Sequence, residues 1–257
     1  MSPLRPFGYL DPMTLVLDPP TVSSLAGRNA AIDWPKAEVD LDATGFAHLP
    51  GLLSRDEATG LAALYASDEI FRSRVVMGRH GFGRGEYKYF SYPLPELVQK
   101  LRAGFYPRLR PVANRWNETL SIKTSFPEDH DDFLLRCHAA GQTRPTPLLL
   151  QYGEGDYNCL HQDLYGEHVF PLQVAILLSS PGVDFAGGEF VLTEQRPRMQ
   201  SRAEVVPLRQ GDAVIFAVHP RPVRGTRGFY RVNMRHGVSR IRAGARHTLG
   251  VIFHDAA

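Results

Sequence analysis

The sequence predicts an α+β fold in which N-terminal helices support a C-terminal β-sandwich or jelly roll. Its 257 residues are 43% hydrophobic and 22% charged, ordinary values for a globular protein with a sizeable core. Helix signals are concentrated before residue 147. After that point, short β-like runs alternate with glycine-containing turns, which is typical of an all-β roll. No internal repeat or clear linker is visible, so we expect a single domain over residues 40–257.

The first fifty residues change from an irregular to a regular pattern. Residues 1–39 are rich in proline and glycine with little periodicity, which predicts a loose N-terminal extension. A short strand and a turn are expected over residues 42–53. Ser54 and Glu57 then form a capping box ahead of apolar residues, and this predicts an amphipathic helix.

Residues 40–146 are expected to supply mostly helical support together with loops that contact the substrate. Pro95 begins a second helix, and residues 106–120 continue the helical layer. Between the helices, residues 80–90 are expected to form a glycine-rich loop that runs into aromatic residues. This loop is not of the nucleotide-binding kind, since no Gly-Lys-Ser/Thr follows it. His130 lies among acidic residues, which favours a solvated loop over a second metal site.

Residues 147–257 are expected to form the β-core. Apolar and β-branched residues recur there in short runs that end at turn residues. The expected strands are residues 148–152, 170–178, 188–193, 212–218, 230–236 and 247–254.

Membrane and secreted classes do not fit the sequence. The longest aliphatic run is only Val174–Leu178, whereas a membrane span needs about 20 residues. The N-terminus lacks the basic start and apolar stretch of a secretory signal. The two cysteines, Cys137 and Cys159, make a disulfide framework improbable, so we expect a cytoplasmic protein. The oligomeric state is left open.

The net charge of +2 conceals two basic segments on an acidic body. Arginine accounts for 25 of the 29 basic residues, and arginine favours bidentate contacts with carboxylate and phosphate. Residues 72–115 hold ten basic and two acidic side chains. Residues 221–246 hold eight arginines and no acid. Nucleic acid is therefore a candidate partner.

Three residues have the composition of a metal site. His161 and Asp163 follow a predicted strand, and their spacing of two points both side chains to the same side of the chain. His236 ends a distant predicted strand and supplies a second imidazole. Two nitrogens and one carboxylate, with open positions left for other ligands, form the facial triad of non-heme Fe(II) oxygenases.

The spacing after His236 resembles that of the 2-oxoglutarate-dependent Fe(II) oxygenases, whose fold is a double-stranded β-helix. Arg246 stands ten positions after His236, where this superfamily places the basic residue that binds the outer carboxylate of 2-oxoglutarate. The resemblance implies Fe(II), 2-oxoglutarate and dioxygen as cofactor and co-substrates. It also implies that Tyr152 and Thr248 contact 2-oxoglutarate. The matching phrases are Gln151-Tyr-Gly-Glu-Gly-Asp-Tyr, Phe185-Ala-Gly-Gly-Glu-Phe and Leu208-Arg-Gln-Gly-Asp-Ala-Val-Ile-Phe.

From Asp40 onward the chain is similar to a bacterial oxygenase family proposed to dealkylate damaged nucleic acid oxidatively. The phrases that match are Arg79-His-Gly-Phe-Gly-Arg-Gly-Glu-Tyr-Lys-Tyr-Phe, Arg144-Pro-Thr-Pro-Leu-Leu-Leu, Gly155-Asp-Tyr-Asn-Cys-Leu-His-Gln-Asp and Glu194-Gln-Arg-Pro-Arg-Met-Gln-Ser-Arg. The resemblance implies dealkylation or hydroxylation of nucleic acid.

The residues expected to bind nucleic acid come from the first basic segment, where basic and aromatic side chains are interleaved. Such a mixture binds phosphates and stacks bases. Three alternatives stay open: a prolyl-type protein or peptide hydroxylase, a small-molecule oxygenase, and a nucleic-acid-binding module that oxidises nothing. The well-known DNA-dealkylating oxygenases carry the motif Arg-x-Asn-x-Thr-x5-Arg, which is absent here. The candidate substrate residues are Arg79, Arg84, Tyr87, Lys88 and Tyr89.

Overall fold

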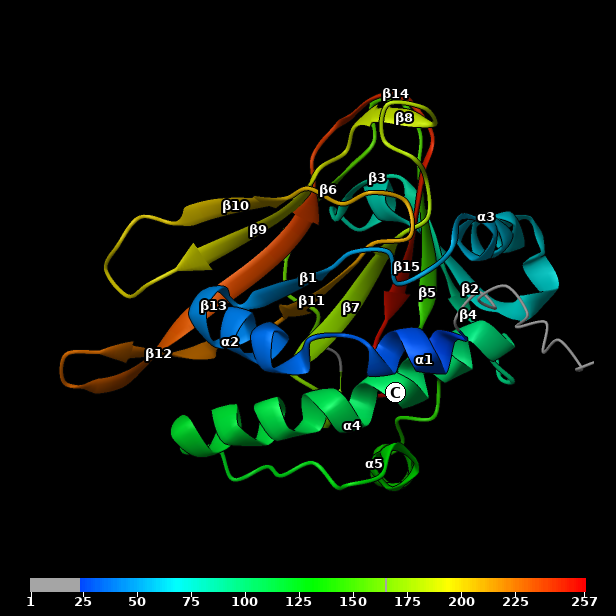
Figure 1. Cartoon of the computed structure of the whole chain (residues 1–257). Coiled ribbons are helices and arrows are strands. Elements are labelled where there is room, and N and C mark those ends of the chain that lie inside the picture. The colour runs from blue at the N-terminus through cyan, green and yellow to red at the C-terminus, as the bar shows by residue number, and fades with distance from the viewer. Residues whose placement is uncertain (1–23, 165) are drawn as a thin grey trace, which may run out of the picture.

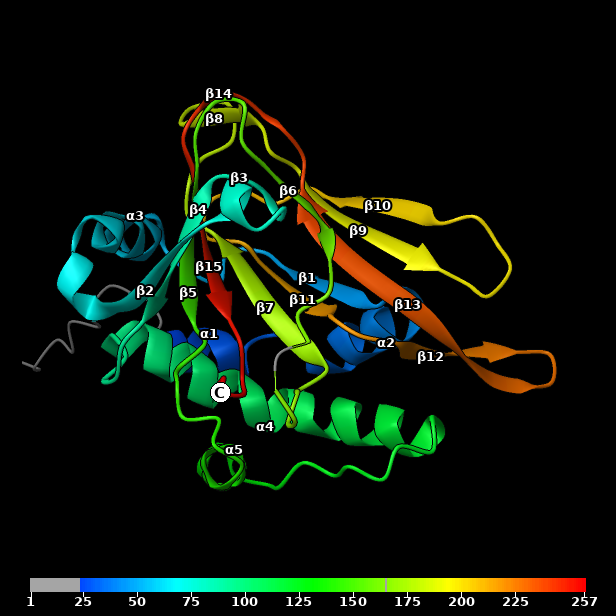
Figure 2. The same cartoon turned by 180° about the vertical axis from the view of Figure 1, so that it is seen from behind.

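Two antiparallel β-sheets form the centre of the molecule in the computed structural model, which describes residues 24–164 and 166–257. Figures 1 and 2 show them from opposite sides. The larger sheet has the order β1-β11-β7-β15-β5-β4-β2, with bounds Phe46–Leu49, Ala213–Ala217, Leu172–Leu177, Arg246–Val251, Leu148–Tyr152, Glu86–Phe90 and Phe71–Val76. The smaller sheet has the order β10-β9-β13-β6-β3, with β12 beside β13, and its bounds are Arg202–Val206, Phe190–Gln195, Gly228–Val238, Tyr157–His161, Gly83–Arg84 and Arg221–Gly225. Strands β8 (Phe185–Gly187) and β14 (Ile241–Gly244) form a separate pair. The predicted α+β jelly roll with supporting helices is confirmed.

The central strands of the larger sheet are buried on both faces, which explains why β7 and β11 are almost continuously apolar. Side chains alternate between the two faces of a strand. In β7, Val174 and Ile176 pack in the cluster that includes the helices. Ala175 and Leu177 pack in a second cluster with Phe190 of the smaller sheet. The space between the two sheets, where this second cluster lies, also contains the candidate site.

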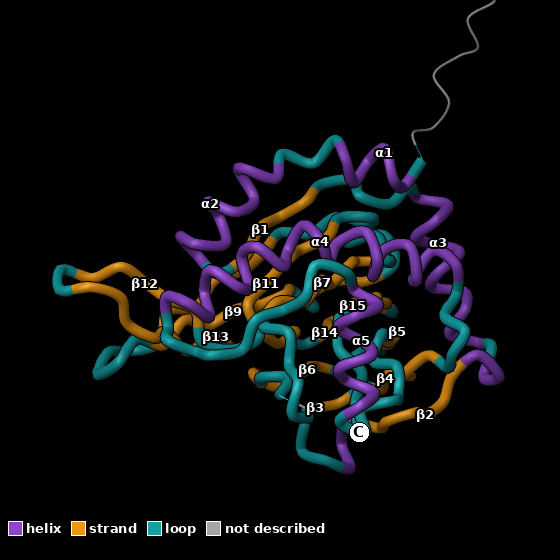
Figure 3. The backbone as a smooth tube through the Cα atoms, turned by 90° about the horizontal axis from the view of Figure 1, so that it is seen from below, coloured by secondary structure: helices purple, strands orange, loops and turns teal. Residues whose placement is uncertain are grey.

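Helices cover the other face of the larger sheet, as Figure 3 shows from below. Helix α3 begins at the predicted capping box: the backbone N–H of Glu57 donates to Ser54 Oγ, and that of Ser54 donates to Glu57 Oε2. Among the described helices, none has the length and apolar character needed to cross a membrane. The helices are α1 (Leu25–Ala30), α2 (Trp34–Thr44), α3 (Arg55–Ala63), α4 (Glu96–Thr119) and α5 (His130–Ala139).

The predicted loose extension over residues 1–39 is wrong for the part that the structure describes, while residues 1–23 lie outside it. Residues 25–30 form α1, and α2 crosses the expected boundary at residue 40. Asp33 caps α2 by accepting from the backbone N–H of Lys36, and Trp34 is buried in the core. Asp-Trp-Pro is a signal for the N-terminus of a helix. The helix that follows is short and weakly amphipathic, so its sequence pattern is weak.

Two predicted loops are regular structure instead. The end of the glycine-rich stretch forms β4, which pairs with both β5 and β2. Tyr87 and Tyr89 point to one side of β4, while Lys88 and Phe90 are buried on the other. His130 begins α5 and is buried, with Nε2 2.8 Å from the carbonyl oxygen of Phe253. The acidic residues beside His130 therefore belong to the N-terminus of a helix, where acidic residues are favourable, and not to a loop.

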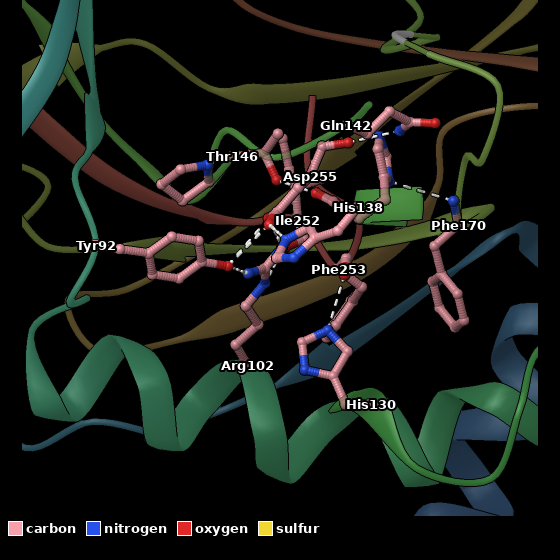
Figure 4. A network of polar contacts seen from close by, with 12 residues as sticks. Tyr92, Arg102, His130, His138, Gln142, Thr146, Phe170, Ile252, Phe253 and Asp255 are labelled. Atoms are coloured by element: carbon pink, nitrogen blue, oxygen red, sulfur yellow. Dashed lines mark hydrogen bonds and ion pairs between the residues drawn. The ribbon is translucent and has the colours of Figure 1, made fainter. Parts of the chain in front are cut away.

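A buried ion pair joins α4 to the C-terminal segment, as Figure 4 shows. Arg102 Nη2 donates to Asp255 Oδ1 at 2.8 Å, and both side chains are fully buried. Arg102 Nε also donates to the carbonyl oxygen of Ile252, and the Asp255 carboxylate accepts from Tyr92 and contacts His138 Nε2 at 2.8 Å. Burial alone would raise the pKa of Asp255, but the charge of Arg102 and the hydrogen bonds lower it. The pair holds the segment that directly follows β15.

Candidate metal centre

The three predicted metal ligands lie together between the sheets. His161 ends β6, and it stands opposite His236 of β13 in the strand register. Asp163 lies between the two imidazoles, with Oδ1 3.4 Å from His161 Nε2 and Oδ2 3.5 Å from His236 Nε2. The candidate ligand atoms all lie within 4.8 Å of one another. One ion can therefore be reached by all three side chains.

The local backbone explains this convergence. In β13, Val232, Met234 and His236 point inward because strand side chains alternate. Gly237 follows His236 and lies against β6: a Cβ there would come within 2.7 Å of the carbonyl oxygen of Asn158. The register between β13 and β6 shifts at this point. Gly237 thus permits the close approach that sets the two imidazoles side by side.

The protonation pattern suits a divalent cation. His161 Nδ1 lies 2.8 Å from the carbonyl oxygen of Cys159, which can only accept, so this nitrogen carries a proton and Nε2 is the nitrogen that faces Asp163. Burial would lower the pKa of His161, but Asp163 raises it, so a proton at Nε2 stands where a divalent cation would bind. Burial would raise the pKa of Asp163, but the two imidazoles outweigh burial and hold it well below its usual range. Burial and the neighbouring His161 lower the pKa of His236, which favours its neutral form. Two imidazole nitrogens and one carboxylate fit Fe(II).

A second group of polar side chains lines the same cavity, whose volume is about 190 Å³. Arg246 of β15 stands opposite Tyr152 of β5 in the register, and its guanidinium lies 5.8 Å from the centre of the Tyr152 ring. Arg246 Nη1 donates to Thr248 Oγ1 at 2.5 Å. Gly188, with φ +65°, leaves room for this arginine, since a Cβ there would lie 3.0 Å from Arg246 Cδ.

This group contains buried polar atoms that suit a ligand with carboxylate oxygens. Arg246 is 1% exposed, and no carboxylate of the described residues forms an ion pair with it. Its Nε and the Tyr152 hydroxyl are buried without a hydrogen-bond partner in the described part of the chain. Burial lowers the pKa of Arg246 to about 10, so the group remains cationic at neutral pH. A buried unpaired cation is costly, and the carboxylate of a keto acid would compensate it. The residues present therefore fit 2-oxoglutarate.

The predicted substrate residues divide into two groups. Tyr87 and Tyr89 line the cavity with the metal ligands. Arg79 and Arg84 are exposed outside the cavity lining, and Arg84 Nε lies 3.7 Å from Asp156. The prediction for Lys88 is wrong.

Lys88 points to the opposite side of β4 from the two tyrosines. Its ammonium donates to the carbonyl oxygen of Tyr65 at 2.7 Å and to Asp68 at 2.6 Å, and the side chain is 7% exposed. Period-two alternation in Glu-Tyr-Lys-Tyr-Phe separates it from its aromatic neighbours. Lys88 is therefore a structural residue.

Sequence reasoning missed two cavity residues. Gln173 of β7 is 4% exposed and lines the cavity, and its Nε2 is buried with no partner among the described residues. A single polar residue inside the apolar run of β7 was the available signal. Phe82 also lines the cavity and is 40% exposed, which places it at the mouth.

Gln142 positions the loop that follows Asp163. Its side chain is 1% exposed, accepts from the backbone N–H of His168 at 2.7 Å and donates to the carbonyl oxygens of His168 and Asp255. Gly166 packs directly on this amide, since a Cβ there would lie 2.5 Å from Nε2. The buried network in Figure 4 thus extends from the C-terminal segment to the loop beside the metal centre.

Comparisons with known proteins agree with this geometry. Residues 85–256 match the model of the Oxygenase-NA family, described as "Oxygenase, catalysing oxidative methylation of damaged DNA". The same uncharacterised protein from two strains of Mycobacterium tuberculosis is 48% identical over 197 residues, which is 75% of this chain and 84% of that protein.

Solved structures show the same fold at low sequence identity. A Pseudomonas putida prolyl-4-hydroxylase aligns over 87% of this chain and 99% of its own, with a TM-score of 0.52 and 14% identity. A 2OG-Fe(II) oxygenase-family oxidoreductase from Burkholderia pseudomallei aligns over 87% and 92%, with a TM-score of 0.50 and 16% identity. The chain therefore belongs to the Oxygenase-NA family, and its fold is the one seen in 2OG-Fe(II) oxygenases.

Proposed function

We propose that this oxygenase hydroxylates alkyl groups on damaged nucleic acid and thereby removes them. The observation that carries the proposal is a cavity lined by the three metal ligands, by the Arg246 group and by the aromatic residues Tyr87, Tyr89 and Phe82. Flat aromatic side chains beside a reactive centre suit a base turned out of its stack. The description of the family names damaged DNA and supports the same substrate class.

The chain's own residues would bind and orient both reactants. His161, Asp163 and His236 would hold Fe(II) on one face. Arg246 would form a bidentate pair with the outer carboxylate of 2-oxoglutarate, and the Tyr152 hydroxyl would donate a further hydrogen bond. Thr248 holds the guanidinium in place by accepting from Nη1.

When bound, iron and 2-oxoglutarate supply the oxidising chemistry: dioxygen, 2-oxoglutarate and a C–H bond become carbon dioxide, succinate and a C–OH group. A methyl group on nitrogen that is hydroxylated in this way leaves as formaldehyde. Oxidation in this cavity would thus remove a methyl group from a base.

Tyr87 and Tyr89 are arranged to present ring surface to a base. Their rings meet edge to face, with centroids 5.3 Å apart and an interplanar angle of 89°. The Arg72 guanidinium lies 4.5 Å from the centre of the Tyr89 ring and fixes its orientation. Burial raises the pKa of Tyr87, so its hydroxyl is neutral at physiological pH.

Replacing Tyr87 by alanine is expected to raise KM for an N-methylated oligonucleotide about 5- to 150-fold, because one base–aromatic stack contributes about 1–3 kcal/mol. KM for 2-oxoglutarate should change little. Oligonucleotide-dependent succinate release measures both constants. Tyr157→Ala, outside the cavity lining, is the matched control. If proline-containing peptides stimulate succinate release and oligonucleotides do not, the peptide hydroxylase is favoured instead.

Replacing Arg246 by lysine should weaken 2-oxoglutarate binding about 10- to 100-fold, because a charge-assisted hydrogen bond contributes about 1.5–3 kcal/mol and lysine cannot form the bidentate pair. Titration calorimetry with 2-oxoglutarate measures the change independently of turnover. Arg242→Lys, at an exposed position of β14, should bind as the wild type does. An unchanged affinity in Arg246→Lys would contradict the assigned role.

A further inference from the structure

Part of the basic charge of residues 72–115 is paired with carboxylates of the same chain. Arg102 is buried with Asp255, and Lys88 is paired with Asp68. Arg74 forms an ion pair with Glu86. Arg84, Lys100 and Arg115 also lie beside carboxylates. The positive charge that this segment offers to a polyanion is therefore smaller than its sequence suggests.

Arginines without a carboxylate partner also lie together on the outer face of the smaller sheet. Arg231 and Arg235 are exposed on β13, on the face opposite to His236. Arg224 of β12 lies on the same face, opposite Phe229, which is 57% exposed. We name Arg224, Arg231 and Arg235 the arginine stripe. Figures 1 and 2 show the hairpin of β12 and β13 projecting from the side of the sheets.

No carboxylate of the described residues forms an ion pair with the stripe. Within the described residues, the stripe makes one side-chain hydrogen bond, from Arg231 Nη2 to the carbonyl oxygen of Leu120 at 3.2 Å. On the neighbouring strand β9, the residues facing the same way are uncharged Thr193 and Gln195. Glu194 points inward and is paired with buried Arg221. The charged side chains of β9, β12 and β13 on this face are thus all basic, which suits a chain of phosphates.

We propose that the arginine stripe binds the phosphate backbone of the nucleic acid whose base enters the cavity. The proposal rests on the proposed function, since it assigns a second contact to the same substrate. Phosphate contacts fix register and orientation without reading sequence, and damaged bases occur in any sequence. An exposed aromatic residue beside the arginines, Phe229, adds a surface on which a base can stack.

A path of exposed apolar residues links the stripe to the mouth of the cavity. Leu160 of β6 is 45% exposed, and β6 is the strand next to β13. Across β6, the carbonyl oxygen of Phe82 accepts from the backbone N–H of Cys159 at 2.9 Å. Phe82 is itself a cavity residue. A nucleic-acid strand bound along the stripe and across Leu160 to Phe82 would therefore bring a base to Tyr87 and Tyr89.

The test is the salt dependence of DNA binding by the double variant Arg224→Glu/Arg231→Glu, which leaves Arg235 beside His236 intact. The probe is a fluorescent, unmodified single-stranded oligonucleotide, and binding is followed by anisotropy across a salt series. Loss of two phosphate contacts should lower the slope of log K against log salt by about 1.4. Arg55→Glu, on α3 at the other side of the molecule (Figure 1), makes an equal charge change per residue and should keep the slope.

Turnover separates this proposal from the proposed function. Succinate release without nucleic acid should be the same in the wild type and the double variant, which shows that the variant folds and keeps its metal centre. If the wild type demethylates oligonucleotides and the double variant does so with unchanged KM and salt slope, the stripe is wrong and the proposed function stands. If the wild type binds oligonucleotides through the stripe but oxidises none, the proposed function is wrong and the stripe stands. Tighter binding to phosphatidylserine vesicles than to DNA would overturn the nucleic-acid assignment of the stripe.

Discussion

Replacing Asp163 by alanine is expected to weaken Fe(II) binding by more than about 100-fold and to abolish succinate release. Loss of a residue that only hydrogen-bonds to a metal ligand already weakens metal binding about 10- to 100-fold. Asp163 is itself a candidate ligand, and it is the one carboxylate among the three. Its removal also takes away the negative charge that both imidazoles contact. Fe(II) affinity measured under anaerobic conditions and succinate release measured in air provide independent readouts.

Glu154→Ala is the matched control for this substitution. Glu154 is an exposed carboxylate in the turn between β5 and β6, and no ion pair joins it to another described residue. This variant should bind Fe(II) and release succinate as the wild type does. Normal turnover in Asp163→Ala would contradict the assignment of the metal centre.

Replacing Arg102 by methionine should lower the free energy of unfolding by about 3–5 kcal/mol, because the substitution leaves the Asp255 carboxylate buried without its partner. Denaturant unfolding followed by circular dichroism measures the change. Lys100→Ala on the same helix removes a pair with Glu96 in which both side chains are largely exposed, so it should leave the free energy of unfolding nearly unchanged. Equal effects of the two substitutions would show that the buried pair has no special role.

The same pair predicts a pH dependence. The pKa of Asp255 is lowered in the folded state, so its stabilising contribution is fully present above the ordinary pKa of an aspartate and is lost as the pH falls through the lowered value. The stability difference between the wild type and Asp255→Asn should therefore shrink on acidification below about pH 4. A difference that stays constant through this range would show that Asp255 carries no charge in the folded protein.

The metal and co-substrate residues could be predicted from spacing together with resemblance to known oxygenases. The His-x-Asp spacing of His161 and Asp163 is a property of one strand end, whereas the ten-residue interval from His236 to Arg246 spans β13, β14 and β15 and was informative only through the resemblance. Strand alternation then determines which side chains share a face. The structure brings these residues into one cavity with Tyr152 and Thr248.

The rest depended on contacts between distant segments, which spacing does not reveal. Lys88 has the composition of a substrate residue, but Asp68 and the carbonyl oxygen of Tyr65 bind it on the other side of the strand. A basic segment in the sequence likewise indicates a nucleic-acid partner only if its side chains are not paired with carboxylates from elsewhere in the chain. Six of the ten basic side chains of residues 72–115 have a carboxylate partner, whereas none of the three arginines of the stripe has one among the described residues.

Oxidative demethylation can be followed by the ratio of formaldehyde to succinate released when an N-methylated oligonucleotide is incubated with Fe(II), 2-oxoglutarate and air. We expect the oligonucleotide to accelerate succinate release and the two products to appear in equal amounts, with neither formed by Asp163→Ala. Succinate release that methylated DNA and RNA leave unchanged, with no formaldehyde, would contradict the proposed function.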